Sequence, residues 1–549
     1  MSPFKNLYSS TFKQLFILMI FLTCFLLGLQ NPALAMNNFF IGARGQGMAG
    51  ANVACVNDET AQHYNPAAFG FFGKKQQPWE LDTTYDNYDL SRKNWGFTIF
   101  DAGAGAKVTG DLPNYVDTLD KMIDTFGEGE GGGLTIDNKE DVKVLTGFVP
   151  ALQGISDPKN GLQFNLNAGT AVRVKNYAIG ARMFFNGGAW VNADTDFTYD
   201  LGYTVDPGDL SEKIENAEGY EDIPQGYEPQ YITGNTRNDL SGLSDDAVQK
   251  LDYAANEQGL SQSEVDRAAK ELNSTMQDGT IDFNQVVGNN ATDDIPEAYS
   301  TQQNGGDALE DNNSTLFLRS FGVAEVPISY GHTVSEHWSV GGNFKLMQGR
   351  VYAEALPVFE KNATEDFGDK FTEAYKETTN FGIDLGINGR YQMFNVGIIA
   401  RNLNSPSFDG PTVNGTKIDD VTLDPQFRMG VAFMPWNNLT IELDYDLNSY
   451  DSVIENYEEQ NIALGAEWDI YKILALRLGA YKNLAEDEVG TVYTGGIGLN
   501  FWLCRLDIAA AASADTLTLE DNDDLDMPLY DNGEAPKEAR VNAKLSVDF

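Results

Sequence analysis

The chain is poor in the residues on which most enzymes and nucleic-acid-binding proteins depend. Its 549 residues include three histidines and three cysteines, and its 37 lysines and arginines stand against 81 acidic residues. The formal net charge of −44 excludes a general nucleic-acid-binding protein, which needs a basic surface, and opposes docking on anionic lipid. A solvated acidic surface that binds divalent cations is consistent with this charge, and so is a proteome adapted to salt.

The cysteines exclude the common cysteine chemistries. Cys24 lies in the leader described below, so only Cys55 and Cys504 remain, far apart and without a Cys-x-x-Cys pair. Thioredoxin-type redox chemistry and a cysteine-based zinc site are therefore unsupported. Two interpretations stay open: two free thiols, or a disulfide between the N-terminal segment and the rest of the chain.

The histidines form no strong catalytic or metal-binding motif. His332 and His337 flank a short turn with Glu336, but this spacing matches no established metal site. Ser335 and Ser339 lie nearby, and nothing marks either as a nucleophile. We therefore expect no catalytic residue, no metal and no cofactor, and interpret the protein as a non-enzyme.

The N-terminus carries the one long apolar run. Two lysines precede an apolar stretch from about Leu15 to Leu29, which is followed by Ala33-Leu34-Ala35. This order predicts a secretory signal peptide over residues 1–35, cleaved before Met36. No later stretch is long enough for a transmembrane helix, so we expect an exported chain whose membrane spans are β-strands.

A glycine-rich segment, residues 36–78, follows the signal peptide and shows neither a helix nor a strand period. It ends in an Asn65-Pro66-Ala67 motif, and its first glycines are Gly42, Gly45, Gly47 and Gly50. Glycines and an Asn-Pro pair indicate turns and close backbone approach. The GARGQG stretch superficially suggests a phosphate loop, but no strand precedes it and no helix follows, so we interpret it as a turn.

Residues 79–549 read mainly as strands. In 439–447 every second residue is apolar and most of the others are carboxylates, so one face can meet lipid and the other a wet lumen. Short turns alternate with long acidic loops, as in outer-membrane barrels. The candidate strands are 79–88, 95–102, 161–175, 177–191, 316–332, 337–352, 378–389, 392–401, 426–434, 438–448, 461–470, 472–482, 490–501, 503–513 and 540–549. A barrel with both ends in the periplasm needs an even number, so either a strand in 189–202 is missed or 79–88 is not one.

Two long connections interrupt the strands. Residues 104–160 are glycine-rich and acidic, with a helix expected over 115–126. Residues 203–313 are a long acidic insertion in which 243–272 predicts one or two solvated helices, with Ser263 as a candidate cap. Since so long an insertion suits a surface loop better than a core, we expect it outside the cell.

The strand pattern and the N-terminal motif together resemble the FadL-type family, outer-membrane barrels that admit long-chain fatty acids and aromatic hydrocarbons. Asn65, Pro66 and Ala67 match the NPA motif of that family residue for residue. The stretches that look most like its conjugal-transfer TraF-like branch are 322–346, 400–408, 423–430, 464–478 and 496–511. The resemblance implies an all-β fold: a transmembrane antiparallel β-barrel of about 14 strands, with an N-terminal plug in the lumen and long extracellular loops.

The barrel interpretation predicts an aromatic girdle and a charged lumen. Five tryptophans fall at or beside the short turns, where the periplasmic girdle is expected: Trp95, Trp338, Trp436, Trp468 and Trp502. The expected inward charges are Arg173, Arg182, Lys345, Arg401, Arg428, Arg477, Arg505, Asp384, Glu442, Asp444, Asp446, Glu467 and Asp507. Either these charges neutralise one another, or one or two arginines bind the carboxylate of a fatty acid.

Within the plug we expect a ligand pocket and a hinge. The candidate pocket residues are Met48, Phe69, Phe71 and Phe72, and the glycines between Gly42 and Gly50 would let the plug move. The alternative for the phenylalanines is that they seal the lumen.

The leading functional hypothesis is a passive transporter of hydrophobic or amphipathic small molecules, such as a long-chain fatty acid or a hydrocarbon. The expected location is the outer membrane of a Gram-negative bacterium, as a multi-pass monomer in contact with lipid and without nucleic acid. The C-terminal Phe549 resembles the signal read by the outer-membrane barrel assembly machinery. The alternative is a docking, secretion or conjugation-associated barrel for exported proteins, and a third is a structural or calcium-binding surface protein.

Overall fold

The computed structural model describes residues 40–72, 94–111, 135–157, 159–192, 198–282, 314–357, 375–413, 415–436, 438–471, 473–501, 503–518 and 534–548, with isolated positions 115, 118, 121, 125 and 194. The signal peptide, the candidate strand 79–88, Trp502 and Phe549 lie outside these residues. The expected helix over 115–126 lies mostly outside them.

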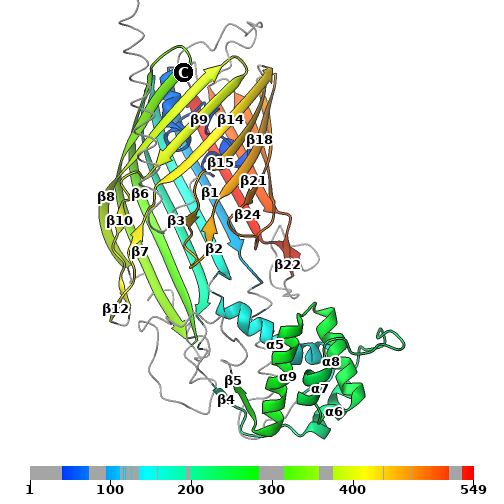
Figure 1. Ribbon diagram of the computed structural model, residues 1–549. Helices are drawn as coiled ribbons and strands as arrows, with labels where there is room; N and C mark the ends of the chain where they lie inside the picture. Colours follow the sequence, from blue (N-terminus) through cyan, green and yellow to red (C-terminus); the bar gives the residue numbers. More distant parts are fainter. Residues whose placement is uncertain are drawn as a thin grey trace, which may run out of the picture.

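Fourteen strands of the described residues close into an antiparallel barrel (Figure 1). Around the barrel they are β1 (Trp95–Val108), β2 (Gly161–Val174), β3 (Tyr177–Asn192), β6 (Thr315–Thr333), β7 (Trp338–Pro357), β8 (Tyr375–Tyr391), β9 (Phe394–Arg401), β14 (Gln426–Trp436), β15 (Leu439–Asp446), β18 (Asn461–Ile470), β19 (Leu474–Asn483), β20 (Val492–Phe501), β21 (Cys504–Ser513) and β24 (Glu538–Asp548). The ring closes where β1 pairs with β24. It therefore closes without the candidate strand 79–88, and the predicted barrel of about fourteen strands is confirmed.

The alternation of side chains decides which face of each strand is wet. In β15, Glu442 and Asp444 are fully buried inside the barrel, while Leu443 between them is 46% exposed on the outside. The same period of two places exposed leucines, isoleucines, phenylalanines and tyrosines on the outer face of the other strands. The barrel thus has an apolar outer surface and a polar lumen, as the sequence pattern predicts.

One rim of the barrel carries the short turns. Lys175, Gln392 and Tyr471 have positive φ in these turns, a backbone conformation typical of tight hairpins. The exposed tryptophans Trp95 and Trp436 stand beside the same rim. Trp338 and Trp468 are also exposed there, so the four described tryptophans of the expected set form a girdle at this end.

Residues 40–72 lie inside the barrel near the short-turn rim (Figure 1). Apart from the half-buried Asn57, every residue from Phe40 to Phe72 is buried. The segment contains α2 (Gly42–Gly47), α3 (Ala61–Tyr64) and the 3-10 helix η1 (Pro66–Phe71). The expectation of a purely turn-like segment, GARGQG included, was therefore wrong, because helices of four to six residues are too short to show a period.

A helical domain stands at the opposite end of the barrel (Figure 1). It contains α5 (Lys139–Ser156), α6 (Pro207–Asn216), α7 (Gly234–Asp239), α8 (Asp245–Glu257) and α9 (Gln262–Gln277), with the hairpin β4 (Thr198–Asp200) and β5 (Thr280–Asp282). Leu145, Leu251 and Leu272 belong to one apolar core that these helices share. None of the described helices is long and apolar enough to cross a membrane.

Two details of this domain correct the sequence-based expectation. The helix α5 was missed, although Asn138 caps it with a capping box, and it joins the insertion rather than forming part of a plain connection. The cap of α9 is Ser261, which forms a capping box with Glu264, and the choice of Ser263 was wrong. The second half of 243–272 is thus a packed amphipathic helix and not a wholly solvated one.

Small hairpins extend from the loops at this same end. They are β10 (Ser407–Phe408) with β13 (Val421–Thr422), β11 (Thr412–Val413) with β12 (Thr416–Lys417), β16 (Tyr450–Asp451) with β17 (Glu458–Glu459), and β22 (Thr516–Thr518) with β23 (Glu534–Pro536). The long loop 402–425, read from the sequence as a connection, sends Phe408, Val421 and Leu423 into the same apolar cluster as the plug.

Candidate functional site

The Asn65-Pro66-Ala67 motif joins the plug to the barrel wall. The side-chain amide of Asn65 donates to the carbonyl oxygens of Val53, at 3.1 Å, and Ile387 of β8, at 2.9 Å. Its side-chain oxygen accepts from the N–H of Ala67, which caps η1, and Pro66 occupies the first turn, where a missing N–H costs nothing. One side chain therefore connects two parts of the plug and one strand.

Two carboxylates of β15 bind four consecutive backbone N–H groups of the plug. Asp444 accepts from Asn52, at 2.9 Å, and from Val53, at 3.1 Å. Glu442 accepts from Ala54, at 2.6 Å, and from Cys55, at 3.1 Å. These N–H groups would otherwise be buried without partners, so the two predicted lumen carboxylates fix an irregular stretch of the plug backbone.

Ion pairs of both polarities connect the plug to the wall. Arg44 of α2 pairs with Glu467 of β18 at 2.9 Å. Asp58 of the plug pairs with Lys544 of β24 at 2.7 Å. On another side of the lumen, Glu59 pairs with Arg173 of β2 at 3.3 Å. All these groups are buried, so removing one member leaves an uncompensated charge inside the barrel.

Inward-facing glycines of the wall let the plug backbone approach closely. A side chain at Gly341 or Gly386 would overlap the NPA motif, at Pro66 and Asn65 respectively. The wall glycines that meet the plug backbone in this way include Gly331, Gly341, Gly397, Gly465, Gly479 and Gly496. The sequence carries the signal for this seat as glycines at inward strand positions, but it does not show which face they line.

The predicted hinge glycines divide into two kinds. Gly42 and Gly50 have positive φ of 74° and 80° and bound the α2 turn, so they are required for its backbone conformation. Gly45 and Gly47 instead face neighbours, the Tyr64 ring and the Arg477 side chain, which leave no room for a Cβ without movement. Whether these glycines act as a hinge stays a prediction.

The four candidate pocket residues are buried, in three separate environments. Phe69 and Phe72 pack together in the large apolar cluster described below, with ring centroids 5.4 Å apart. The Arg390 guanidinium lies 4.6 Å from the Phe71 ring centre, and Met48 belongs to a smaller cluster with Cys55. The structure therefore does not gather these four residues around one site.

The predicted lumen charges face inward and occur in pairs. Arg428 lies 3.2 Å from Asp446 and 3.5 Å from Asp444. Arg477 pairs with Glu467, at 2.7 Å, and with Asp507, at 2.8 Å. Further pairs join Arg182 with Asp101, Lys345 with Asp384, and Arg505 with Asp507. These contacts are the mutual neutralisation that was one of the two open interpretations.

Arg401 lies at the border between the plug and an apolar region. Its guanidinium donates to the carbonyl oxygen of His63. The ring of His63 lies 3.5 Å from Glu325 and packs edge-on against Phe184. Of the predicted arginines, Arg401 is thus the one placed beside both the plug and an apolar side chain of that region.

An apolar stripe runs through the otherwise charged lumen. We use this name for one contiguous cluster that joins the loop 402–425, the inner faces of three strands and the plug. Its members are Phe408, Val421 and Leu423 from the loop, Ala178, Phe184, Phe321, Val323, Met347 and Val351 from β3, β6 and β7, and Ile41, Val56, Ala61, Tyr64, Ala68, Phe69 and Phe72 from the plug. The sequence analysis missed it, although β6 is apolar on both faces near Phe321 and Val323.

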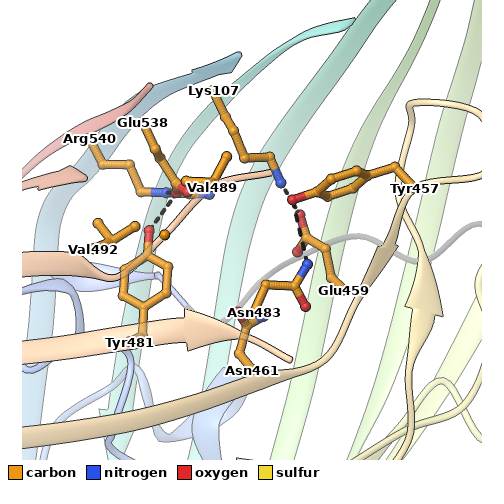
Figure 2. Close-up of a pocket in the computed structure, with 11 residues that line it drawn as sticks. Lys107, Tyr457, Glu459, Asn461, Tyr481, Asn483, Val489, Val492, Glu538 and Arg540 are labelled. Atoms are coloured by element: carbon orange, nitrogen blue, oxygen red, sulfur yellow. Dashed lines mark hydrogen bonds and ion pairs between the residues drawn. The ribbon is translucent and has the colours of Figure 1, made fainter. Parts of the chain in front are cut away.

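A second chamber, on the charged side of the lumen, is nearly closed (Figure 2). Figure 2 shows Lys107 pointing at Glu459 beside the Tyr457 ring, with Arg540, Glu538 and Tyr481 across the space. The enclosed volume is about 10 Å³, room for about one water molecule. This side of the lumen therefore offers no room for an organic ligand in the present arrangement.

The barrel wall is interrupted beside the plug. Pairing of β3 with β6 runs as far as Ile179 and resumes at Arg182, leaving out the stretch that faces Pro327, which has no N–H to donate. On the far side of β2, β1 bulges between Thr98 and Asp101. A small cavity at this place is lined by Gln62 and other plug residues and by Gly180 and Pro327 of the wall.

The cysteines and histidines have ordinary packing contacts. Cys55 is buried and Cys504 is exposed, and both thiols are free, so the disulfide alternative does not hold. Ser339 donates to the carbonyl oxygen of Ala67 and so belongs to the plug seat, while His337 contacts the carbonyl oxygen of Arg390. Among the described residues, no group of three histidine, cysteine or acidic side chains could bind a metal ion.

Comparison with known proteins gives one family and several solved barrels. The model of the family described as "F plasmid transfer operon, TraF, protein" matches residues 63–446. A search of curated proteins finds no match.

Three solved structures illustrate the similarity of architecture. The Ralstonia pickettii toluene transporter TbuX is 10% identical, with 92% of this chain and 98% of that chain covered and a TM-score of 0.40. The Pseudomonas putida toluene transporter TodX is 9% identical, with 94% and 99% covered and a TM-score of 0.38. A Pseudomonas aeruginosa FadL homologue is 10% identical, with 94% and 100% covered and a TM-score of 0.39.

Proposed function

This chain belongs to the family described as "F plasmid transfer operon, TraF, protein", and we propose that it is a plugged barrel of the outer membrane that passes hydrophobic or amphipathic small molecules. The apolar outer face and the tryptophan girdle support placement in a membrane. The buried plug supports a closed resting state, because its backbone is bonded to the wall on several sides.

The apolar stripe is the observation that carries this proposal. A lumen built only to pass ions or polar solutes gains nothing from a contiguous apolar cluster, because water and charge avoid it. Here the cluster reaches from loop residue Phe408, past Phe321 of β6, to Phe69 of the plug. A long-chain fatty acid or a hydrocarbon could therefore exchange contacts with these side chains all the way to the plug, where Arg401 stands ready for a carboxylate.

The interruption of the wall supplies an exit. The stripe runs along β3 and β6, and the gap at Pro327 lies between these same two strands. Plug residues 59–63 fill the inner side of this gap. Movement of this part of the plug would open a path from the stripe to the outside of the wall.

Mass spectrometry of small molecules tests the proposal. The barrel is extracted gently from native membranes, and organic compounds released on denaturation are identified. Transport predicts a near-stoichiometric fatty acid or hydrocarbon. The replacement Val323→Asn, in the middle of the stripe, should reduce its amount severalfold, while Gln163→Asn, also inward-facing but outside the stripe, should not.

Docking of exported proteins is the second candidate, and the helical domain favours it. Residues 203–313 carry 24 acidic and 5 basic side chains, a formal charge of −19, and their helices share a core with α5. A packed acidic domain at the long-loop end is a suitable surface for a basic partner. Deleting 203–313 should spare ligand binding if the barrel is a transporter, and abolish capture of exported proteins if it is a docking platform.

A further inference from the structure

A groove of about 650 Å³ lies on the outer wall of the barrel, outside the lumen. Its floor is made of small residues on neighbouring strands, among them Ala102, Ala168, Gly322 and Ala324. One side is apolar, with Leu166 and Met183 exposed on the outer surface of β2 and β3. The opposite side is polar and carries Gln348, Arg350 and Tyr352 of β7.

The strand register explains why the two sides differ. Along one cross-strand row, Leu166 faces Phe185, Phe185 faces Gly322, Gly322 faces Arg350, and Arg350 faces Glu377 of β8. At one level of the wall, the outer surface thus changes from apolar to charged across a glycine. A groove with these two sides accommodates an amphiphile lying across the strands, with its apolar part over β2 and β3.

The charged side lies at the level of the lipid headgroups. Arg350 is twelve residues beyond Trp338, which stands in the girdle at the other rim. Twelve residues of a strand tilted by about 40° rise about 31 Å, and the apolar band of such barrels is about 25 Å tall. Below this level β7 presents the apolar Phe344 and Leu346 outward, and above it the polar Gln348 and Arg350.

The two charges at the rim form an exposed pair with a defined geometry. The guanidinium of Arg350 lies 2.7 Å from the Glu377 carboxylate and 5.0 Å from the Tyr375 ring centre. Gln348 donates to the same carboxylate at 2.8 Å. Because both side chains are partly exposed, a ligand can add a negative group at the arginine and a positive group at the carboxylate.

We propose that this groove binds a zwitterionic phospholipid of the surrounding membrane, with its phosphate at Arg350, its ammonium group at Glu377 and an acyl chain over Gly322 and Ala324. The charge pair matches a phosphoethanolamine headgroup, whereas an anionic headgroup would meet the Glu377 carboxylate without compensation. The inference rests on the membrane placement in the proposed function, and it assigns a lipid site separate from the transport path.

Native mass spectrometry of the full-length barrel tests this assignment. The protein is delipidated in detergent and titrated with palmitoyl-oleoyl-phosphatidylethanolamine or with the phosphatidylglycerol of the same chains. We expect one phosphatidylethanolamine bound per barrel, about tenfold more tightly than phosphatidylglycerol. Arg350→Gln should weaken phosphatidylethanolamine binding about tenfold, since it removes a charge-assisted contact. Ala324→Trp should abolish retention by filling the floor.

Lys482→Gln is the matched control, because Lys482 also forms an exposed ion pair on the barrel, 3.0 Å from Asp487, and does not line the groove. It should leave lipid binding unchanged. Equal binding of both lipids, equal retention by Arg350→Gln, or a groove occupied by a ligand without phosphate overturns the assignment. Small-molecule uptake by the same variants separates the two proposals: loss of lipid with normal uptake touches only the groove, and loss of uptake in the wild type touches only transport.

Discussion

Asn65 shows how much of the plug seat depends on single side chains. Its amide group uses both its donor and its acceptor side, bonding Val53, Ile387 and Ala67, and it is fully buried. The sequence motif identified this residue, but the partners lie hundreds of positions away for Ile387. Only the folded barrel shows that the motif is a contact between plug and wall.

Replacing Asn65 by alanine should loosen the plug. The change leaves two buried carbonyl oxygens and one N–H without this partner, and each lost hydrogen bond costs about 1 kcal/mol, so we expect about 2–4 kcal/mol in total. Single-channel recording in planar bilayers should show more frequent opening events than in the wild type. Asn165→Ala is the control, because Asn165 faces inward on β2 and bonds Arg540 of the wall instead of the plug. Identical opening in both variants would contradict this role.

The two residues Glu442 and Asp444 illustrate what the sequence can and cannot say at this scale. Their alternation with apolar residues predicts that they face the lumen, and they do. Their binding of four consecutive plug N–H groups depends on a non-repeating backbone whose path no periodicity encodes. Signals for such partners require knowledge of which strand stands opposite which plug residue.

Among the elements, strands were predicted well and helices poorly, for a physical reason. Strands of 8 to 20 residues repeat their alternation often enough to be seen, as in β7 and β15. The helices of the plug are a single turn or slightly more, and α5 contains Pro150 and follows a glycine-rich stretch. The apolar stripe was missed because inward apolar positions stand next to outward apolar positions in β6.

A neighbouring pair of glycines on β7 provides an element-scale test of the plug seat. An alanine at Gly341 would press its Cβ into Pro66 and Ala67 of the plug. At Gly342 the Cβ would point to the other face and meet only Asp384 and Leu385 at 3.1 Å. We therefore expect Gly341→Ala to make the plug accessible to protease in detergent.

The control for this test is Gly342→Ala, which adds the same methyl group one position along the strand. It should show wild-type resistance of the plug to protease. Protection of the plug in Gly341→Ala, or digestion in both variants, would mean that close glycine contact does not seat it.

The helical domain should respond to pH through Glu271 of α9. Burial raises the pKa of this carboxyl to about 7, against the opposing effect of the Asp282 N–H that donates to it. A folded-state pKa above the unfolded value means that the folded domain retains the proton, so the domain loses stability as pH rises from about 4.5 to about 7. Hydrogen exchange of α9 in the full-length protein should accelerate over this interval.

Glu271→Gln should remove this pH dependence, because glutamine keeps the shape and cannot ionise. The matched control is Glu212→Gln in α6, whose side chain is exposed, and it should retain the wild-type pH profile. An unchanged profile in Glu271→Gln would assign the effect to other groups of the domain.

At the scale of the whole molecule, the chain separates three tasks in space. The barrel wall has an apolar outer face, the plug closes the lumen near the short-turn rim, and an acidic helical domain stands at the other end (Figure 1). The strand pattern and the NPA motif were sufficient to predict the barrel. The joining of α5 to the insertion was not predictable from local sequence, since the two segments are separated by strands β2 and β3.

The central claim is that hydrophobic molecules cross this barrel along the apolar stripe. Uptake of a labelled long-chain fatty acid by Gram-negative cells tests it most directly, with each variant checked for folding by heat-modifiable gel migration. The account predicts that the wild type raises uptake above an empty vector, that Val323→Asn lowers it severalfold, and that Gln163→Asn and deletion of 203–313 leave it intact. Uptake equal to the vector, or unaffected by Val323→Asn, would contradict the account.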